Sequence, residues 1–334
     1  MTTTGAGGIG RRTLLVGGAL ALGGCFGLRR DRGRHISGVR LGAHAGPVSV
    51  VSIASDSRLA VTADAATTPR LHVWDLRTRR RTHTMLAPGA VRAMALVEER
   101  NAVAIAGWSV LERRAFLSIL DLETGRTLCE LDDGAALPVD DLHALGDGRV
   151  LASRASVTEA AGSTLWDCDD ASIVRRSPFA ADALAADRRS ALAGHAIWDV
   201  ETTLVRARLP SDTLLSWGRA LSPDGASAVI DDVGGAGTLW TDEGARVRTF
   251  DDQPRGLWSA AFSLDGRFLL TASDLPADGP RRGAIVLRDA GSGRALARLP
   301  GHRDHPRAVA FSPDTRLAVT ADRGGAVYLW SLAL

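Results

Sequence analysis

Two sets of four residues carry side chains that could do acid–base chemistry. The first set is His44, Thr62, Asp64 and Trp74, and the second is His302, Thr320, Asp322 and Trp330. In both sets the threonine follows the histidine by 18 positions and the aspartate follows the threonine by two. A histidine hydrogen-bonded to an aspartate could serve as a general base toward a hydroxyl nucleophile, as it does in many hydrolases.

The motifs that would complete such an enzyme are missing from the sequence. No serine stands in a G-x-S-x-G frame, and neither an H-E-x-x-H motif nor a P-loop occurs. Three cysteines are too few for a disulfide framework and have no metal-binding spacing; we expect Cys129 and Cys168 to be small buried residues. We therefore predict no catalytic residues, no metal site and no cofactor.

Composition and charge also limit the classes of partner. The 334-residue chain is 45% hydrophobic and 23% charged, which is ordinary for a globular protein. Its formal net charge is only +2, and its arginines are scattered among aspartates and glutamates. A nucleic-acid-binding surface normally concentrates basic residues, so we expect no nucleic-acid partner.

The N-terminal stretch GRRTLLVGGALALGGC, residues 10–25, is predicted to be an export signal. Its apolar run of about a dozen residues is shorter than the roughly 20 that a spanning helix needs. Arg11 and Arg12 before this run resemble a twin-arginine signal, and Leu-Gly-Gly-Cys resembles a bacterial lipobox, which implies a diacylated Cys25. We predict a signal peptide over 1–24, a tether over 25–35, and a lipid anchor on the extracytoplasmic face of the cytoplasmic membrane. A secretory signal that is cut nearby, or a short uncleaved anchor, is the alternative.

Seven related segments follow the tether. Each ends in a β-rich run at or near a Trp-Asp pair, as in LHVWD, STLWD and VYLWS, and the copies recur every 32 to 48 residues. Alternating hydrophobicity broken by turn residues predicts strands and hairpins within each copy. The near-identical stretches DSRLAVTAD, residues 56–64, and DTRLAVTAD, residues 314–322, belong to the first and last copies.

These segments, with the phrases SPDG, AFSPD and VWDL, resemble WD-repeat β-propellers across about 300 residues. The resemblance implies an all-β fold over 36–334, a seven-bladed propeller of four-stranded antiparallel blades. The last copy stops four residues after Trp330 and lacks an outer strand, whereas residues 34–44 have the character of one. In the resembling family the N-terminal strand completes the last blade, so we expect the two ends to meet there.

The family resemblance also implies a structural role for the two sets of polar residues. In that family a histidine, a serine or threonine, an aspartate and a tryptophan form a hydrogen-bonded network, which would satisfy polar groups buried in the blade. Blade six has Gln253 and Thr271 at the same spacing, but Arg288 replaces the tryptophan. We expect the network to be incomplete in blade six.

Partner-binding residues are predicted at the mouth of the central channel. In the resembling family, the residue seven before the acidic residue of the first hairpin points to this mouth. The corresponding positions here are Ser49, Arg92, Asp140, Ala180, Trp217, Trp258 and Arg307. Tryptophan and arginine are enriched at interface hot spots, so we predict that Trp217, Trp258, Arg307, Arg92 and Arg255 bind a partner, with Arg219 nearby. The alternative is that the indoles pack under loops and the arginines are ordinary solvated charges.

The function favoured by the sequence is a non-catalytic platform, a monomeric propeller that binds a protein or peptide at its mouth. An extracytoplasmic propeller enzyme, of the lactonase or quinoprotein kind, is the competing class. Such enzymes bring several carboxylates or a cofactor cage to the axis, whereas the predicted mouth offers only Asp140. A cell-envelope assembly factor is the third possibility.

Overall fold

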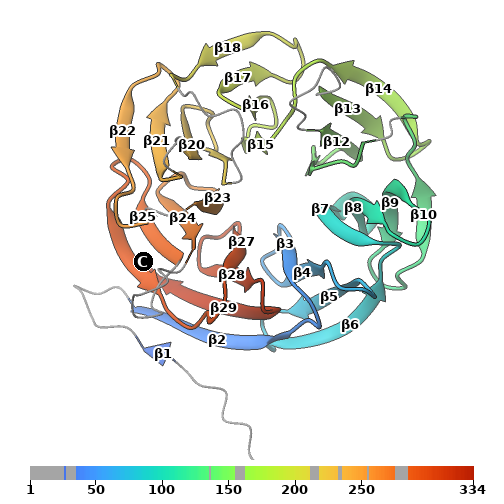
Figure 1. Ribbon diagram of the computed structural model, residues 1–334, viewed down its shortest axis with the longest axis horizontal. Helices are drawn as coiled ribbons and strands as arrows, with labels where there is room; N and C mark the ends of the chain where they lie inside the picture. Colours follow the sequence, from blue (N-terminus) through green and yellow to red (C-terminus); the bar gives the residue numbers. More distant parts are fainter. Residues whose placement is uncertain are drawn as a thin grey trace, which may run out of the picture.

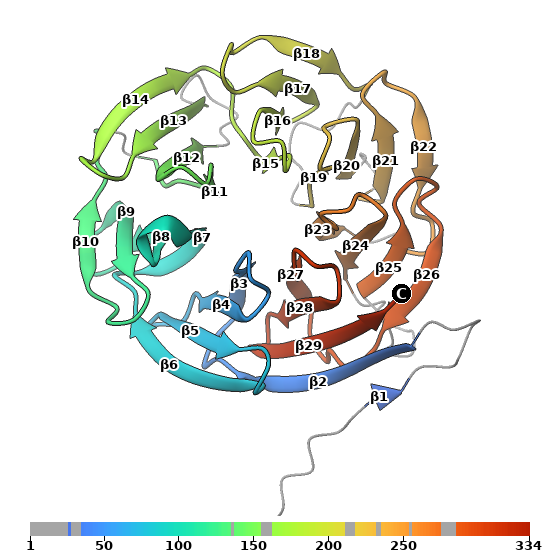
Figure 2. The same cartoon turned by 180° about the vertical axis from the view of Figure 1, so that it is seen from behind.

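The computed structural model is a closed ring of seven β-sheets that radiate from a central axis (Figure 1; Figure 2). It describes residues 26–27, 35–134, 137–154, 162–210, 218–231, 235–253, 256–274 and 285–334. Six of the sheets have four strands and the seventh has five. The prediction of a seven-bladed propeller is confirmed.

Each blade uses consecutive strands, from the innermost to the outermost. Blade one contains β3 (Val48–Ile53), β4 (Leu59–Asp64), β5 (Arg70–Asp75) and β6 (Arg80–Leu86). Blade two contains β7 (Ala90–Val97), β8 (Ala102–Ser109), β9 (Arg114–Asp121) and β10 (Thr127–Glu130). Blade three contains β11 (Asp141–Ala144), β12 (Arg149–Arg154), β13 (Gly162–Asp167) and β14 (Ser172–Ser177).

The remaining blades follow the same order, and only blade seven takes strands from both ends of the chain. Blade four contains β15 (Ala183–Leu184), β16 (Ser190–Ala193), β17 (Ala196–Asp199) and β18 (Val205–Arg208). Blade five contains β19 (Ala220–Leu221), β20 (Ser227–Asp231), β21 (Gly237–Thr241) and β22 (Arg246–Thr249). Blade six contains β23 (Leu257–Phe262), β24 (Phe268–Ser273), β25 (Ile285–Asp289) and β26 (Ala295–Leu299). Blade seven contains β27 (Pro306–Phe311), β28 (Leu317–Asp322), β29 (Ala326–Ala333), β2 (His35–Ala43) and β1 (Phe26–Gly27).

Helical structure is sparse in the part of the chain that the structure describes. The 3-10 helix η1 (Glu98–Arg100) forms the turn between β7 and β8. Among the described residues, no helix reaches the length and hydropathy that crossing a membrane requires.

The described residues form seven hydrophobic clusters, one between each pair of neighbouring blades. Successive residues of a strand point to opposite faces of the sheet. In β5, Val73 therefore packs against blade two, whereas Trp74 packs against blade seven. Each blade thus has two hydrophobic faces, and both are covered when the ring is complete.

The tryptophans of the third strands pack on one side of their blades, toward the preceding blade. Trp74 packs against blade seven, Trp166 against blade two, Trp198 against blade three and Trp330 against blade six. Each is at most 2% exposed. In these four blades the repeated tryptophan therefore fills the contact with the preceding blade.

The ring is closed by β2, which pairs with the C-terminal strand β29 from His35 opposite Ala333 to Ala43 opposite Ala326 (Figure 1). Phe26 and Gly27 add a short strand to the outer edge of β2. The two near-identical stretches flank the resulting seam, where Ala60 of β4 packs with Val319 of β28. The predicted completion of the last blade by an N-terminal strand is confirmed.

Close packing at the seam makes Gly38 of β2 a sensitive position. A Cβ at Gly38 would lie 2.3 Å from the ring of Trp330, so even a methyl group would overlap the indole. We expect Gly38→Ala to destabilise the ring by about 1–3 kcal/mol, the usual cost of overpacking. Arg40→Ala, at an exposed position of the same strand, is the matched control and should change stability by less than about 0.5 kcal/mol. Denaturant unfolding measures both variants, and equal stability would contradict the tight seam.

Candidate functional site

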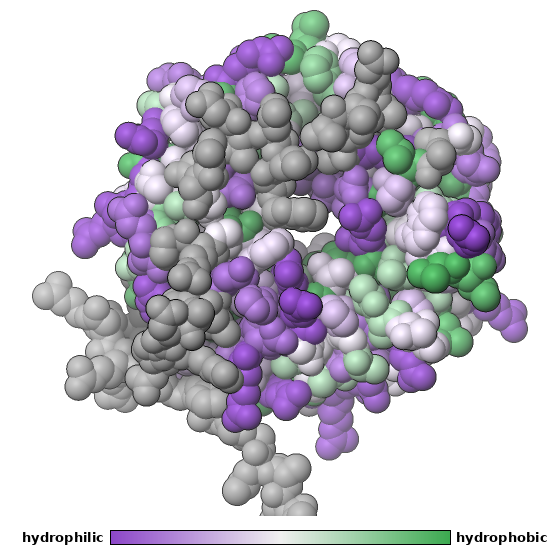
Figure 3. Space-filling view, in the orientation of Figure 1, coloured by the Kyte–Doolittle hydropathy of each residue, from purple (hydrophilic) through white to green (hydrophobic). Residues whose placement is uncertain are grey.

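The channel along the ring axis widens into a cavity of about 760 Å³ where the inner strands begin. We call this end of the channel the upper mouth. The space-filling view is hollowed at the axis of the ring (Figure 3). This volume is within the range of small-molecule and peptide pockets, roughly 300–1,000 Å³.

Five of the seven predicted mouth positions line this cavity: Ser49, Arg92, Asp140, Trp258 and Arg307. Ala180 is not among its lining residues. It is buried, and its carbonyl oxygen accepts a hydrogen bond of 2.8 Å from the indole N–H of Trp198. Trp217 and Arg255 lie outside the described residues. The structure therefore places Arg92, Trp258 and Arg307 around one opening and corrects the position assigned to Ala180.

Trp258 and Arg307 form a stacked pair on blades six and seven. The Arg307 guanidinium carbon lies 3.6 Å from the centre of the Trp258 ring, a cation–π geometry. The indole N–H donates to Asp274, and the same carboxylate lies 2.7 Å from Nδ1 of His305. Burial of Arg307 lowers the pKa of its guanidinium. The pair is thus held in place by its own contacts, and binding a partner would require little ordering of these side chains.

The opposite wall of the upper mouth carries paired charges. Arg92 lies 3.4 Å from Asp140, and Arg219 forms an almost buried ion pair with Asp182. Burial, with the neighbouring carboxylates of Asp182 and Asp140, raises the pKa of Asp141 to about 8. At neutral pH Asp141 is therefore largely protonated and can donate a hydrogen bond.

The upper mouth therefore combines an aromatic platform with guanidinium and carboxyl groups on several blades. Such a surface suits an extended polar segment, which can stack on the indole and pair with charges at the rim. Among the described residues, no three histidine, cysteine, aspartate or glutamate side chains are grouped so that they could hold a metal ion.

The first predicted polar set is hydrogen-bonded within blade one. Nδ1 of His44 lies 2.9 Å from Asp64, and its Nε2 lies 2.7 Å from Oγ1 of Thr62. The Trp74 indole donates to the same threonine oxygen at 2.8 Å. Burial acts to raise the pKa of Asp64, but hydrogen bonds from His44 and from the backbone N–H groups of Arg70 and Ala66 outweigh it, so the pKa is lowered.

Blade seven contains the same arrangement. His302 lies 2.7 Å from Asp322 and 2.8 Å from Thr320, and Trp330 donates to Thr320 at 2.8 Å. All of these side chains are buried between blades, away from the cavity at the upper mouth. Their positions therefore fit a structural role.

Blade six has a different network, built on Arg288, with Ser273 at the position that the aspartate occupies in blades one and seven. Nε of Arg288 donates to Thr271 at 3.0 Å, and its Nη2 donates to both Gln253 and Asp252 at 2.7 Å. The guanidinium also lies over the ring of Phe250, 4.0 Å from its centre. Arginine can replace tryptophan here because its planar group both packs on the preceding blade and donates to the threonine.

Sequence reasoning did not identify three groups at the upper mouth: Asp141, Asp182 and the Asp274–His305 pair. Asp182 follows the offset position Ala180 by two residues, so a two-residue shift of the blade-four alignment could have found it. No sequence signal marks Asp274, because its contact with Trp258 joins the end of β24 to the start of β23 only after the blade has formed.

Comparison with known proteins agrees with the fold. Residues 244–275 and 293–331 match the family model described as WD domain, G-beta repeat. Each matching segment begins near the outer strand of one blade and continues into the next blade. The Meiotic recombination protein rec14 of Schizosaccharomyces pombe is 28% identical over 131 residues, which is 37% of this chain. The chain thus matches only 40% of the length of that relative.

Arg288 and Arg298 both pair with Asp252, so the loss of stability on removing a buried arginine can be compared with that on removing an exposed one. The Arg288 side chain is 2% exposed and that of Arg298 is 46% exposed. We expect Arg288→Met to destabilise the protein by about 1–3 kcal/mol, since buried Thr271 and Gln253 each lose a hydrogen bond from the guanidinium. Arg298→Ala should cost less than about 1 kcal/mol. Urea unfolding of both variants distinguishes these costs, and similar values would show that the Arg288 network contributes little.

Proposed function

We propose that the protein is a non-catalytic interaction platform that binds a protein or peptide segment at the upper mouth. WD-repeat propellers are typically protein-interaction scaffolds, and two segments of this chain match the WD-repeat family model. The observation that carries the proposal is the Trp258–Arg307 stack at the edge of the 760 Å³ cavity. Arginine and tryptophan that are already ordered before binding have the properties of an interface hot spot.

The distribution of charge favours a polar segment over a flat apolar surface. Arg92, Asp140 and Arg307 present both signs of charge around one opening, and each side chain lines the cavity. A partner with mixed charge would find complementary groups on several blades, and mismatched charges would be rejected.

We further propose that a lipid on Cys25 anchors this platform to the extracytoplasmic face of a bacterial cytoplasmic membrane. Cys25 lies outside the described residues, but it directly precedes β1, which pairs at the outer edge of blade seven. The chain therefore joins the ring at its circumference. Phe26 and Gly27 pair with Gly38 and Ser37, near the middle of the outermost long strand. An anchor attached at the circumference would lie away from the axis, where the upper mouth opens.

Crosslinking followed by affinity measurement tests the platform. A photo-crosslinking residue in place of Arg92 should capture a partner in cells, whereas the same residue in place of Arg80, on the outer strand β6, should not. The purified partner should then bind Trp258→Ala and Arg307→Gln about 30-fold more weakly than the unchanged protein, the loss expected for a hot spot. Thermal unfolding of both variants controls for folding, and unchanged affinity in two folded variants would refute the proposed binding surface.

Membrane attachment is tested separately at the cysteines. Cys25→Ser should abolish incorporation of an alkyne-labelled fatty acid and release the protein from the membrane fraction, because a thioether-linked lipid needs the thiol. Cys129→Ser, at a half-buried position on β10, should keep both the label and the membrane attachment. If Cys25→Ser still carries the label, the anchor is wrong, whatever the outcome at the upper mouth.

A further inference from the structure

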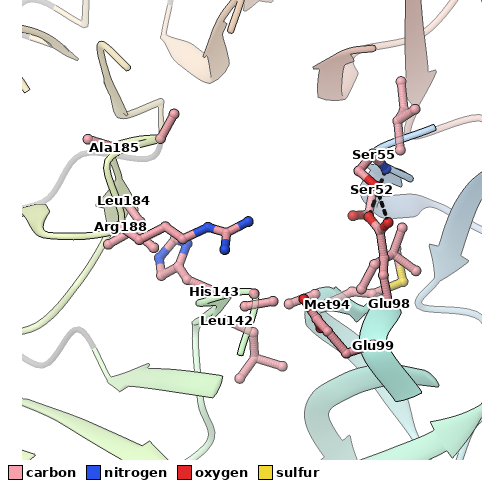
Figure 4. A pocket seen from close by; sticks show the side chains of 16 residues that line it. Ser52, Ser55, Met94, Glu98, Glu99, Leu142, His143, Leu184, Ala185 and Arg188 are labelled. Carbon is pink, nitrogen blue, oxygen red and sulfur yellow. Dashed lines mark hydrogen bonds between the residues drawn. The ribbon is translucent and has the colours of Figure 1, made fainter. Parts of the chain in front are cut away.

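A second pocket, of about 360 Å³, lies at the other end of the channel, where the inner strands turn into the second strands. We call it the lower pocket. Its walls come from blades one and two on one side and from blades three and four on the other (Figure 4). It meets the upper cavity at Met94, Leu142 and His143, which line both.

Arg188 supplies a fixed positive charge on the blade-four wall. It occupies a left-handed turn position with φ +59°, where blades three, five and six carry Gly148, Gly225 and Gly266. An arginine in this conformation is strained, whereas glycine is not. Nη1 of Arg188 donates to the carbonyl of Leu145 at 2.7 Å, and the guanidinium points into the pocket (Figure 4).

The neighbouring backbone makes room for this guanidinium. A Cβ at Gly146 would lie 1.6 Å from Nη1 of Arg188, so only glycine at position 146 permits the observed placement. The Arg188 guanidinium is therefore held by its hydrogen bond to the Leu145 carbonyl, and it occupies the space that a side chain at position 146 would fill.

Glu98 and Glu99 supply negative charge on the facing wall, which belongs to blade two. Glu98 is held by Ser55, whose backbone N–H donates to it at 2.7 Å and whose hydroxyl donates to its second oxygen. Both glutamates are exposed. Within the described part of the chain, no ion pair links either glutamate to Arg188.

The floor between these charges is apolar and uncharged. Ile53, Met94, Leu142 and Leu184 line it. Burial lowers the pKa of His143, whose Nε2 lies 2.8 Å from the carbonyl oxygen of Ala181, so this side chain is neutral at neutral pH. The pocket therefore offers a guanidinium, an apolar floor and a pair of carboxylates in that order.

We propose that the lower pocket binds a short peptide with a free amino group and a free carboxyl group. The carboxylate would pair with Arg188 through two N–H donors, the ammonium with Glu98 and Glu99, and a central apolar side chain with the floor. In a single amino acid both charges sit on one carbon, whereas here they come from blades two and four with blade three between them. A chain of two or three residues carries its two charges at opposite ends, as the two walls of the pocket carry theirs. The three charged groups of this site, Arg188, Glu98 and Glu99, do not line the upper cavity.

Calorimetric titration of the purified full-length protein with alanyl-leucyl-alanine tests the proposal. The free peptide should bind saturably, and the same peptide with an acetylated N-terminus and an amidated C-terminus should not. Arg188→Gly should weaken binding about 10- to 100-fold, the loss of a charge-assisted hydrogen-bond pair, while relieving backbone strain at the turn. Thr315→Gly, at the equivalent turn of blade seven with φ +60°, is the matched control and should bind like the unchanged protein.

Selective amidation assigns each end of the peptide. A peptide amidated only at its C-terminus should bind the unchanged protein and Arg188→Gly equally weakly, because the guanidinium then has no carboxylate to meet. No saturation up to about 10 mM free peptide, or equal binding of the free and capped forms, would overturn the proposal. Trp258→Ala should leave this binding unchanged, so a failure here is distinguishable from a failure at the upper mouth.

Discussion

The pairing of β2 with β29 is the contact on which the rest of the ring depends. Every blade has two hydrophobic faces, and a row of blades without closure would expose one face at each end as well as an unpaired strand edge. The hydrogen bonds from His35–Ala333 to Ala43–Ala326 join the two ends of the chain and so cover both faces at once. Because Gly38 lies against Trp330 and Gly42 against Trp74, the closing strand also holds the tryptophans on either side of the seam.

The same constraint explains why blades one, six and seven each carry a large, flat residue at the same position of the third strand. In these three blades the residue fills the space toward the preceding blade and also donates a hydrogen bond to a threonine of the second strand. Trp74 and Trp330 meet both demands through the indole ring and its N–H. Arg288 meets them with a guanidinium that stacks on Phe250 and donates to Thr271, at the cost of a buried charge that Asp252 must balance. The residue at this position is therefore determined by the space to be filled and by the threonine acceptor, and an arginine can meet both requirements as well as a tryptophan.

Much of the fold could be predicted from the sequence because its determinants are local. The period near 43 residues, the alternation within each strand and the missing outer strand after Trp330 each follow from neighbouring residues, and they specified the blades and their closure. The offset rule also placed Ser49, Arg92, Asp140, Trp258 and Arg307 around one cavity. It could not find Asp274 beneath Trp258 or the proximity of Asp141 to Asp182, since these contacts depend on how separate strands and blades face one another. The replacement network of Arg288 was missed for the same reason, because Asp252 and Phe250 lie in the connection that precedes its blade.

Residues at the two ends of the channel can change more easily than the clusters between the blades. Residues at the turns and at the strand entrances face the axis, whereas the clusters that hold the ring lie between blades. A substitution at a turn therefore leaves the core intact and is limited only by the backbone conformation at that site. Arg188 illustrates this limit, since it accepts a left-handed conformation that costs about 1 kcal/mol relative to glycine and in return places a guanidinium in the lower pocket. Because the core lies between the blades and the turns lie at the channel, a substitution in the turn of one blade can add a charge to either mouth without disturbing the core. Substitutions of this kind would make the blades differ from one another, as they do in this ring.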